Sequence, residues 1–271
     1  MTWSRGSSTL ARVALPALIL LAFPFSCSTA PEGREHPRIL VFAAASLQDA
    51  LQELAAPLLE ETGLEAVFNF AGSNVLAQQA RASRGADVFL SADTAWMEWL
   101  ADAGRVVPES SRELLSNRLV VISHPRGPRR LLALEDLPGL GFEHLSIADP
   151  ESVPAGRYAE SLLRGVASGD ATLWERVRDR VVPAPDVRAA LALVAARVDT
   201  IGLVYRTDQR RSEGVRLLLE IEAELQPPIR YCAALLKDGE AGLERGRELL
   251  EFLSSPGARR VFEEHGFVTL P

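Results

Sequence analysis

The sequence contains little cysteine and little histidine. Among its 271 residues are two cysteines, Cys27 and Cys232, and four histidines. Two cysteines exclude a disulfide framework and a cysteine-based metal site, and a lone Cys232 in the apolar run YCAALL is typical of a small buried side chain. The histidines have no ligand spacing such as i, i+4, which argues against a histidine metal site. They are His36, His124, His144 and His265.

The chain also has fewer basic than acidic residues, with 29 Lys and Arg against 36 Asp and Glu. The formal net charge is −7, and it becomes about −9 once residues 1–30, which carry Arg5 and Arg12, are removed. Nucleic-acid binding depends on Lys and Arg contacts to phosphate, so an acidic chain is a poor candidate for a nucleic-acid partner. With 47% hydrophobic and 24% charged residues, the chain is too apolar for disorder and fits one or two globular domains.

The N-terminus has the pattern of a secretory signal peptide over residues 1–30. Arginines precede an apolar run, residues 13–25, and small residues follow up to Ala30. The run is too short for a comfortable membrane span, so we expect export of the chain from the cytoplasm. A cut after Ala30 leaves a soluble chain, whereas Cys27 is the alternative site of a lipid anchor. Pro24 stands where a lipoprotein signal has an aliphatic residue, which favours soluble release.

Short apolar runs alternate with helical patterns from Arg38 to the end of the chain. Leucines recur at helical spacing, for example at Leu47, Leu51, Leu54 and Leu58. Continuous apolar runs of this length are expected of strands covered on both faces. They are Ile39–Ala43, Ala66–Phe70, Asp87–Leu90, Leu119–Ile122, Leu145–Ala148, Ile201–Tyr205 and Ile229–Leu236. The alternation predicts an α/β protein with mainly parallel sheets flanked by helices.

Four junctions between a strand or loop and a helix carry small or capping residues. They are FAAAS at residues 42–46, FAGSN at 70–74, DPESVPAG at 149–156 and PAPDV at 183–187. A helix N-terminus has unpaired N–H groups and a partial positive charge, so it can bind an anion without any Lys or Arg. Gly and Ala let the anion approach the backbone, and serine adds a hydroxyl donor. Because Ser and Asp are ordinary N-caps and Pro is ordinary in a first turn, each junction taken singly is better explained as a cap.

In combination, these stretches resemble the periplasmic molybdate-binding proteins that serve ABC importers. The matching pieces follow the order of that family and cover nearly all of the chain after the signal segment. They are residues 41–47, 70–77, 85–93, 149–158, 186–194 and 202–208. One position departs from the family, because Asn74 follows Ser73 where a small residue or another serine is common. We expect Asn74 to cap its helix rather than reach the anion.

The resemblance implies the two-lobed (type II) periplasmic binding protein fold with a ligand cleft between the lobes. Residues 37–118 and 232–271 would form lobe 1, and residues 119–231 would form lobe 2. The chain would cross between the lobes near Leu119–Ile122 and Ile229–Leu236.

The resemblance also implies a site that binds a tetrahedral oxyanion through uncharged donors. Ser46 and Ser73 would donate from lobe 1 through hydroxyl and backbone N–H groups. Ala155 and Val187 would donate backbone N–H groups from lobe 2, and Tyr205 would donate its phenolic O–H. A site made only of donors suits a fully deprotonated dianion and disfavours hydrogen phosphate, whose proton finds no acceptor.

The implied ligand is molybdate, or tungstate, which is nearly equal in size. Molybdenum would be held as the oxyanion, with no direct bond between protein and metal. We expect no cofactor and no catalysis. The expected partner is the membrane permease of an ABC importer, which would sense the closed form of a monomeric binding protein.

Three other functions stay open on the sequence. Sulfate is also a bare dianion, so only the size of the site could reject it. A secreted hydrolase would use Ser46 or Ser73 as its nucleophile, although neither serine lies in a Gly-x-Ser-x-Gly elbow and no histidine motif supports a triad. A protein-interaction module with a degenerate site would bind no oxyanion.

Overall fold

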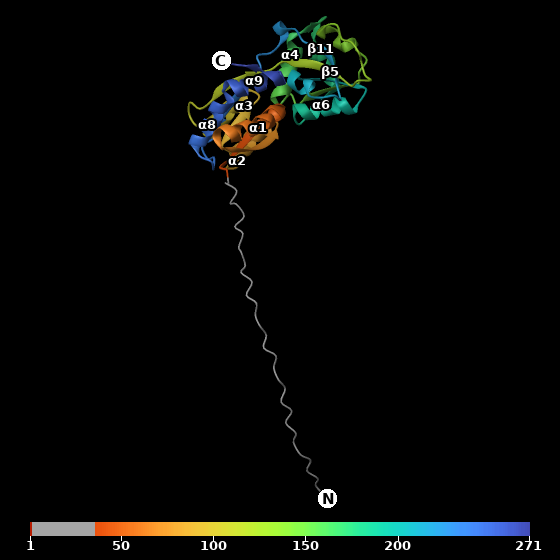
Figure 1. Cartoon of the computed structure of the whole chain (residues 1–271). Helices are drawn as coiled ribbons and strands as arrows, with labels where there is room; N and C mark the ends of the chain where they lie inside the picture. Colours follow the sequence, from red (N-terminus) through yellow and green to blue (C-terminus); the bar gives the residue numbers. More distant parts are fainter. Residues whose placement is uncertain (2–35) are drawn as a thin grey trace. The chain divides into compact units, whose positions relative to one another are not determined.

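The computed structural model describes Met1 and residues 36–271. Beyond Met1, the predicted signal segment and Cys27 lie outside the described residues. Residues 36–271 form one compact unit that contains two large sheets, each flanked by helices (Figure 1). The predicted α/β class is therefore confirmed. Within this part of the chain, no helix is both long and apolar enough to cross a membrane.

Six strands form the first sheet. In spatial order they are β13 (Val268–Thr269), β4 (Arg112–Ser116), β12 (Tyr231–Leu235), β3 (Val88–Ser91), β1 (Arg38–Ala44) and β2 (Glu65–Ala71). Strand β1 runs parallel to both of its neighbours. Strand β12 runs antiparallel to β3 and β4, and β13 runs antiparallel to β4.

Five strands form the second sheet. In spatial order they are β11 (Arg216–Glu220), β5 (Leu119–Ser123), β10 (Thr200–Tyr205), β6 (His144–Ala148) and β9 (Val181–Ala184). Strand β6 runs parallel to β9 and β10, and β5 runs antiparallel to β10 and β11. A separate two-stranded hairpin consists of β7 (Ala167–Ser168) and β8 (Ala171–Thr172).

Both large sheets are mixed. The pairings of β1 with β2 and β3, and of β6 with β9 and β10, are parallel as predicted, and the remaining pairings are antiparallel. A continuous apolar run indicates burial on both faces but does not fix the direction of a strand. The chain passes from the first sheet to the second between β4 and β5, and it returns between β11 and β12.

The helices of residues 36–271 cover the faces of these sheets. The α-helices are α1 (Gln48–Thr62), α2 (Ser73–Ala82), α3 (Thr94–Asp102), α4 (Pro154–Gly165), α5 (Leu173–Val177), α6 (Val187–Ala196), α7 (Arg206–Arg210), α8 (Leu243–Leu253) and α9 (Pro256–His265). The 3-10 helices are η1 (Ala45–Leu47), η2 (Leu134–Gly139), η3 (Arg178–Arg180) and η4 (Ala223–Leu225). Helix α1 packs with α8 and α9, α2 packs with α3, and α6 packs on β6 and β10.

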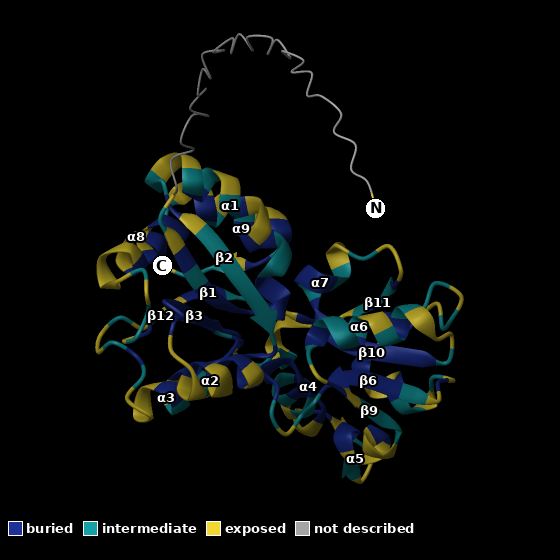
Figure 2. Cartoon of the chain, turned by 90° about the horizontal axis from the view of Figure 1, so that it is seen from below, coloured by how far each residue is buried: buried dark blue, intermediate teal, exposed yellow. Residues whose placement is uncertain are grey.

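The apolar stripe of α1 shows how the sequence pattern becomes core. Leu51, Leu54 and Leu58 lie one turn apart or nearly so, and all three are buried with Val41 of β1. Each buried leucine contributes about 1.5–3 kcal/mol relative to an exposed one. Figure 2 shows the result, with buried strands inside and exposed helix faces outside.

Candidate functional site

Four helices begin close to the ends of parallel strands, and their N-termini meet at one pocket. Strand β1 leads into η1, β2 into α2, β6 into α4 and β9 into α6. The paired strand ends are level in each sheet, since Ala44 pairs with Ala71 and Ala148 pairs with Ala184. Parallel strands thereby bring their carboxyl ends to one edge, where ligands bind in open α/β sheets. Residues from all four junctions line the pocket.

All five residues predicted to bind an anion lie on this pocket. They are Ser46, Ser73, Ala155, Val187 and Tyr205, and each is at most 5% exposed. Ser46 lies in η1, Ser73 begins α2, Ala155 lies in the first turn of α4 and Val187 begins α6. The structure therefore gathers potential donors from both sheets, while their contact with an anion stays a prediction.

Three of the four helix starts have no side-chain cap. The N-cap residues of η1, α2 and α4 are Ala44, Gly72 and Val153, and none makes a side-chain cap hydrogen bond. These residues cannot satisfy the first-turn N–H groups, for which Ser, Thr, Asp and Asn are preferred. Only α6 is capped, because Asp186 accepts a hydrogen bond from the Ala189 N–H at 2.9 Å. Capping alone therefore does not explain the other three junctions.

Tyr205 lines the pocket, and its hydroxyl has no hydrogen-bond partner among the described residues. Tyr205 ends β10 and is 1% exposed, and its Oη atom is buried and unpaired. A buried polar group without a partner costs about 1–3 kcal/mol, so this hydroxyl is suited to donate to an acceptor that enters the pocket. Burial raises the pKa of Tyr205 well above its ordinary value, and the hydroxyl therefore stays a donor.

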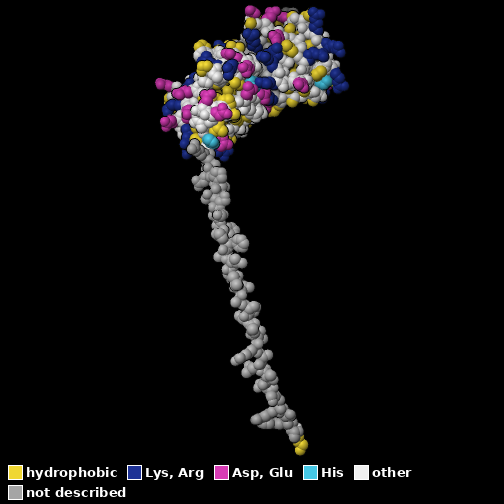
Figure 3. Space-filling model, viewed as in Figure 1, with side chains coloured by type: hydrophobic (Ala, Val, Ile, Leu, Met, Phe, Trp, Pro, Cys, Tyr) yellow, Lys and Arg dark blue, Asp and Glu magenta, His cyan; other side chains and the backbone are white. Residues whose placement is uncertain are grey.

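The pocket is small, and Asp186 is the charged residue of its lining. Its empty volume, counted together with the open solvent at its mouth, is about 230 Å³. On the face shown in Figure 3, acidic and basic side chains are intermingled rather than sorted into one basic patch. An anion in this pocket would be neutralised by helix N-termini and hydroxyl groups.

Both serine hydroxyls of the pocket already have one protein partner. Ser73 Oγ accepts a hydrogen bond from the Ala92 N–H at 3.0 Å, and Ser46 Oγ lies 2.9 Å from Tyr231 Oη. None of the described histidines borders the pocket. Because a serine nucleophile needs a base within hydrogen-bond reach, the geometry disfavours the hydrolase alternative.

Several contacts join the half of the molecule built on the first sheet to the half built on the second. Trp96 Nε1 donates a hydrogen bond to the Ser152 carbonyl at 2.7 Å. The Gly72 backbone lies so close to the other half that a Cβ atom there would be 2.9 Å from the carbonyl oxygen of Pro185. Gly72 lines the pocket and Ser152 precedes Val153 of its lining, so these contacts hold the two halves against each other beside the pocket.

Asn74 does not cap helix α2, so that expectation is wrong. The N-cap residue is Gly72, and Asn74 is the second residue of the helix. Its Nδ2 atom instead donates a hydrogen bond to Ser152 Oγ in the other half at 3.0 Å, and its Oδ1 atom is buried without a partner. Asn74 therefore connects the halves beside the pocket without lining it.

Arg188 joins carboxylates from both halves beside the pocket. The guanidinium group pairs with Asp49 of α1, and its Nε atom lies 3.3 Å from Asp208 Oδ1 of α7. Asp208 is buried, and this burial raises its pKa to about 7 even though Arg188 acts in the opposite direction. A half-exposed pair such as Arg188–Asp49 contributes about 0–1 kcal/mol, so it adds only modestly to closure.

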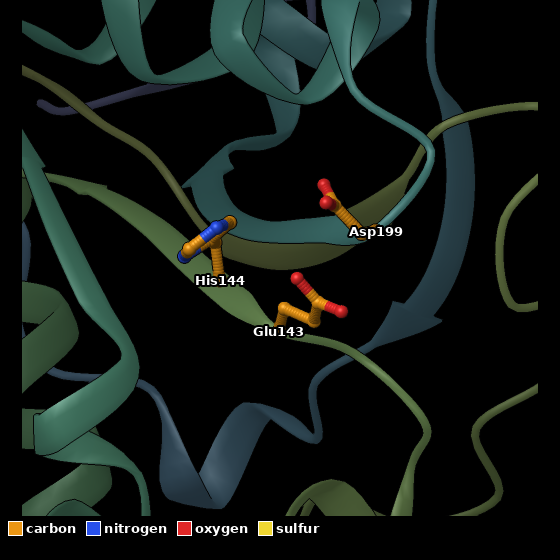
Figure 4. A group of neighbouring side chains, drawn as sticks. All are labelled: Glu143, His144 and Asp199. Carbon is orange, nitrogen blue, oxygen red and sulfur yellow. The ribbon is translucent and has the colours of Figure 1, made fainter.

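A second polar cluster lies outside the pocket lining. Glu143, His144 and Asp199 offer potential ligand atoms that all lie within 4.8 Å of one another (Figure 4). Arg197, however, donates to the Asp199 carboxylate at 2.8 and 3.1 Å, and these hydrogen bonds lower the pKa of Asp199. A cation would have to compete with this guanidinium group. The cluster is thus explained as a surface ion pair beside a histidine.

Comparison with known proteins agrees with the geometry. The family model described as bacterial extracellular solute-binding protein matches residues 39–268. The molybdate-binding protein ModA of Haemophilus influenzae is 34% identical over 91% of this chain and 93% of its own length. ModA of Escherichia coli is 32% identical over 86% of this chain and 90% of its own length. The solved periplasmic molybdate-binding protein of Azotobacter vinelandii shares the fold, with a TM-score of 0.73 and 21% identity over 86% of this chain and 99% of its own. The chain therefore belongs to the bacterial extracellular solute-binding protein family.

Proposed function

We propose that this protein captures molybdate, and equally tungstate, outside the cytoplasm and delivers it to the membrane permease of an ABC importer. The observation that carries the proposal is the unpaired Tyr205 hydroxyl, which faces a pocket bordered by three uncapped helix N-termini. Two relatives more than 30% identical to this chain are named molybdate-binding proteins. Molybdate carries no proton at neutral pH, and it therefore suits a site made of donors.

The five pocket residues would share the oxygens of the anion. Ser46 and Ser73 would donate hydroxyl and backbone N–H groups, and Ala155 and Val187 would donate backbone N–H groups from the other half. Tyr205 would complete the set with its O–H. The anion is cargo, held without a bond to its metal atom, and the protein would need neither a cofactor nor catalysis for this role.

Capture would proceed by closure of two lobes. We propose lobe 1 at residues 37–118 and 232–271 and lobe 2 at residues 119–231, a division that follows the two sheets except at Tyr231, which begins β12 of the first sheet. Because each lobe holds only part of the donor set, only the closed form satisfies every oxygen of the anion, and binding would shift the protein toward closure. The protein would act as an exported monomer that presents its closed form to the permease.

Size would discriminate among bare dianions. Sulfate has shorter bonds than molybdate, so a cage spaced for molybdate would leave some of its oxygens without a donor at hydrogen-bond distance. Hydrogen phosphate would be disfavoured for a different reason, because its proton would face donors.

A panel of anions tests this function. The exported protein would be heated with molybdate, tungstate, sulfate or phosphate at matched ionic strength, and the dissociation constants would then be measured by calorimetry. Molybdate and tungstate at a hundredfold excess over Kd should each stabilise the protein by about 2.7 kcal/mol, and sulfate and phosphate should shift the melting temperature far less. An equal or larger shift with sulfate would instead assign the pocket to sulfate, and no shift with any anion would favour an interaction module.

A further inference from the structure

A chain of buried hydrogen bonds leads from the second half of the molecule to Ser46. Asn117 Nδ2 lies 3.0 Å from Thr207 Oγ1 and 3.2 Å from Tyr231 Oη, and Tyr231 Oη lies 2.9 Å from Ser46 Oγ. All four side chains belong to buried residues. Asn117 lies between β4 and β5, where the chain passes between the sheets, and Tyr231 begins β12, where the chain has returned. Neither residue lines the pocket.

The orientation of the Asn117 amide is fixed by the backbone. The Arg118 N–H donates a hydrogen bond to Asn117 Oδ1 at 2.8 Å. The opposite orientation would place the amide NH₂ group against that N–H, with two donors facing each other. The NH₂ group therefore points to Thr207 and Tyr231, and one of its hydrogens is donated to Tyr231 Oη.

This orientation determines how Tyr231 meets Ser46. Tyr231 Oη has no other partner among the described side chains than Asn117 and Ser46. If Ser46 donated to Tyr231, the tyrosine hydrogen would be buried without an acceptor, which is unfavourable. Tyr231 therefore donates to Ser46 Oγ, and the hydrogen of the Ser46 hydroxyl is left for the pocket. Ser73 is arranged in the same way, since its Oγ atom accepts from the Ala92 N–H.

We propose that Tyr231 and Asn117 are positioning residues that present the Ser46 hydroxyl to the anion as a hydrogen-bond donor and so help the pocket to select a deprotonated oxyanion. This inference rests on the proposed function. A free serine hydroxyl both donates and accepts, and it would tolerate the proton of hydrogen phosphate. Because Tyr231 occupies one of the two acceptor lone pairs of Ser46 Oγ, the remaining arrangement favours donation of the Ser46 hydrogen to the guest, and a protonated guest that meets this hydrogen faces a second donor.

A double-mutant cycle tests this series of hydrogen bonds from Asn117 through Tyr231 to Ser46, called the relay below. Molybdate and phosphate Kd values would be measured by calorimetry for wild type, Tyr231→Phe, Ser46→Ala and the double variant. We expect Ser46→Ala to weaken molybdate binding about 10- to 100-fold, in line with the loss of a hydrogen bond to a charged group. Tyr231→Phe should weaken it about 3- to 10-fold, and it should change binding less than about twofold when Ser46 is already alanine, because the two residues act through one hydroxyl.

The matched control is Tyr158→Phe. Tyr158 Oη accepts a hydrogen bond from the Arg230 N–H at 3.4 Å and does not belong to the relay. Both Tyr→Phe changes should lower stability, but only Tyr231→Phe should alter affinity and narrow the preference for molybdate over phosphate. A purely structural role for Tyr231 would move the melting temperature and leave that preference unchanged.

The inference is overturned if Tyr231→Phe binds both anions like wild type, or if it weakens molybdate binding by the same factor with and without Ser46. Should Tyr231→Phe fail to fold, Asn117→Asp serves instead. Its carboxylate would accept from Tyr231, so Tyr231 would take the Ser46 hydrogen. Asn117→Asp should then weaken molybdate binding by a smaller factor when Ser46 is already alanine. An equal factor with and without Ser46 would overturn the inference. A wild-type protein that binds neither molybdate nor tungstate would overturn the proposed function, and the relay with it.

Discussion

Replacement of Tyr205 by phenylalanine should have opposite effects on ligand binding and on the ligand-free protein. Tyr205 is 1% exposed and its hydroxyl has no partner among the described residues, so the change removes a donor that no described protein atom uses. A hydrogen bond to a charged partner contributes about 1.5–3 kcal/mol, which corresponds to a molybdate Kd weakened roughly 10- to 150-fold. Without ligand, loss of the unpaired hydroxyl should leave the stability unchanged or raise it.

Calorimetric titration measures the expected loss of molybdate affinity, and urea unfolding of the same preparations measures the expected unchanged or increased stability without ligand. Tyr158→Phe is the comparison, because that hydroxyl does have a partner, the Arg230 N–H. It should lose about 0.5–1.5 kcal/mol of stability and keep the wild-type Kd. A Tyr205→Phe protein that binds molybdate as tightly as wild type would remove Tyr205 from the site and would refute the reasoning from its unpaired hydroxyl.

Two further changes test closure and pH dependence. Gly72→Ala would place a Cβ atom 2.5 Å from the Asn74 Oδ1 atom, whose side chain can move, and 2.9 Å from the Pro185 carbonyl oxygen of the other half. It should weaken molybdate binding on the order of tenfold with little change in ligand-free stability, and calorimetry showing wild-type affinity would contradict this. Burial raises the pKa of Asp208 to about 7, so the folded protein keeps a proton that the unfolded chain loses as the pH rises above about 4. This contribution to stability is therefore lost as the pH rises through about 7. Urea unfolding should show that the free energy of unfolding falls more between about pH 5 and about pH 8 in wild type than in Asp208→Asn. An equal fall in both proteins would contradict a raised pKa of Asp208.

The strands that the sequence predicts are those with continuous apolar runs. Strand β9 was missed because it contains Pro183 and lies at a sheet edge with partly exposed residues. Strand β4 was missed because it starts with exposed Arg112 and Glu113. In such strands one side of the ladder or one face meets solvent, so the residues do not form the uninterrupted apolar pattern of a central strand.

The pocket was predictable through the family resemblance, but its supporting side chains were not. Ser46 and Tyr231 are 185 positions apart in the chain, and no local pattern indicates which buried hydroxyl will face another. Tyr231 does lie in the predicted strand Ile229–Leu236, although a strand prediction gives no partner for its side chain. The apolar N-caps Ala44 and Val153 are a signal that the sequence does contain, because a helix start without a polar cap leaves N–H groups for some other acceptor.

The burial of the pocket lining has a kinetic consequence. Ser46, Ser73 and Tyr205 are each at most 5% exposed, and the Trp96–Ser152 and Asn74–Ser152 bonds fasten the two walls together. An anion that takes hydrogen bonds from both walls would be held until the walls separate, so its departure would be a first-order event that a competitor in solution cannot accelerate. The residence time of the anion would then depend on how often the two halves open. A transporter that holds them apart would control release of the anion without changing any hydrogen-bond donor.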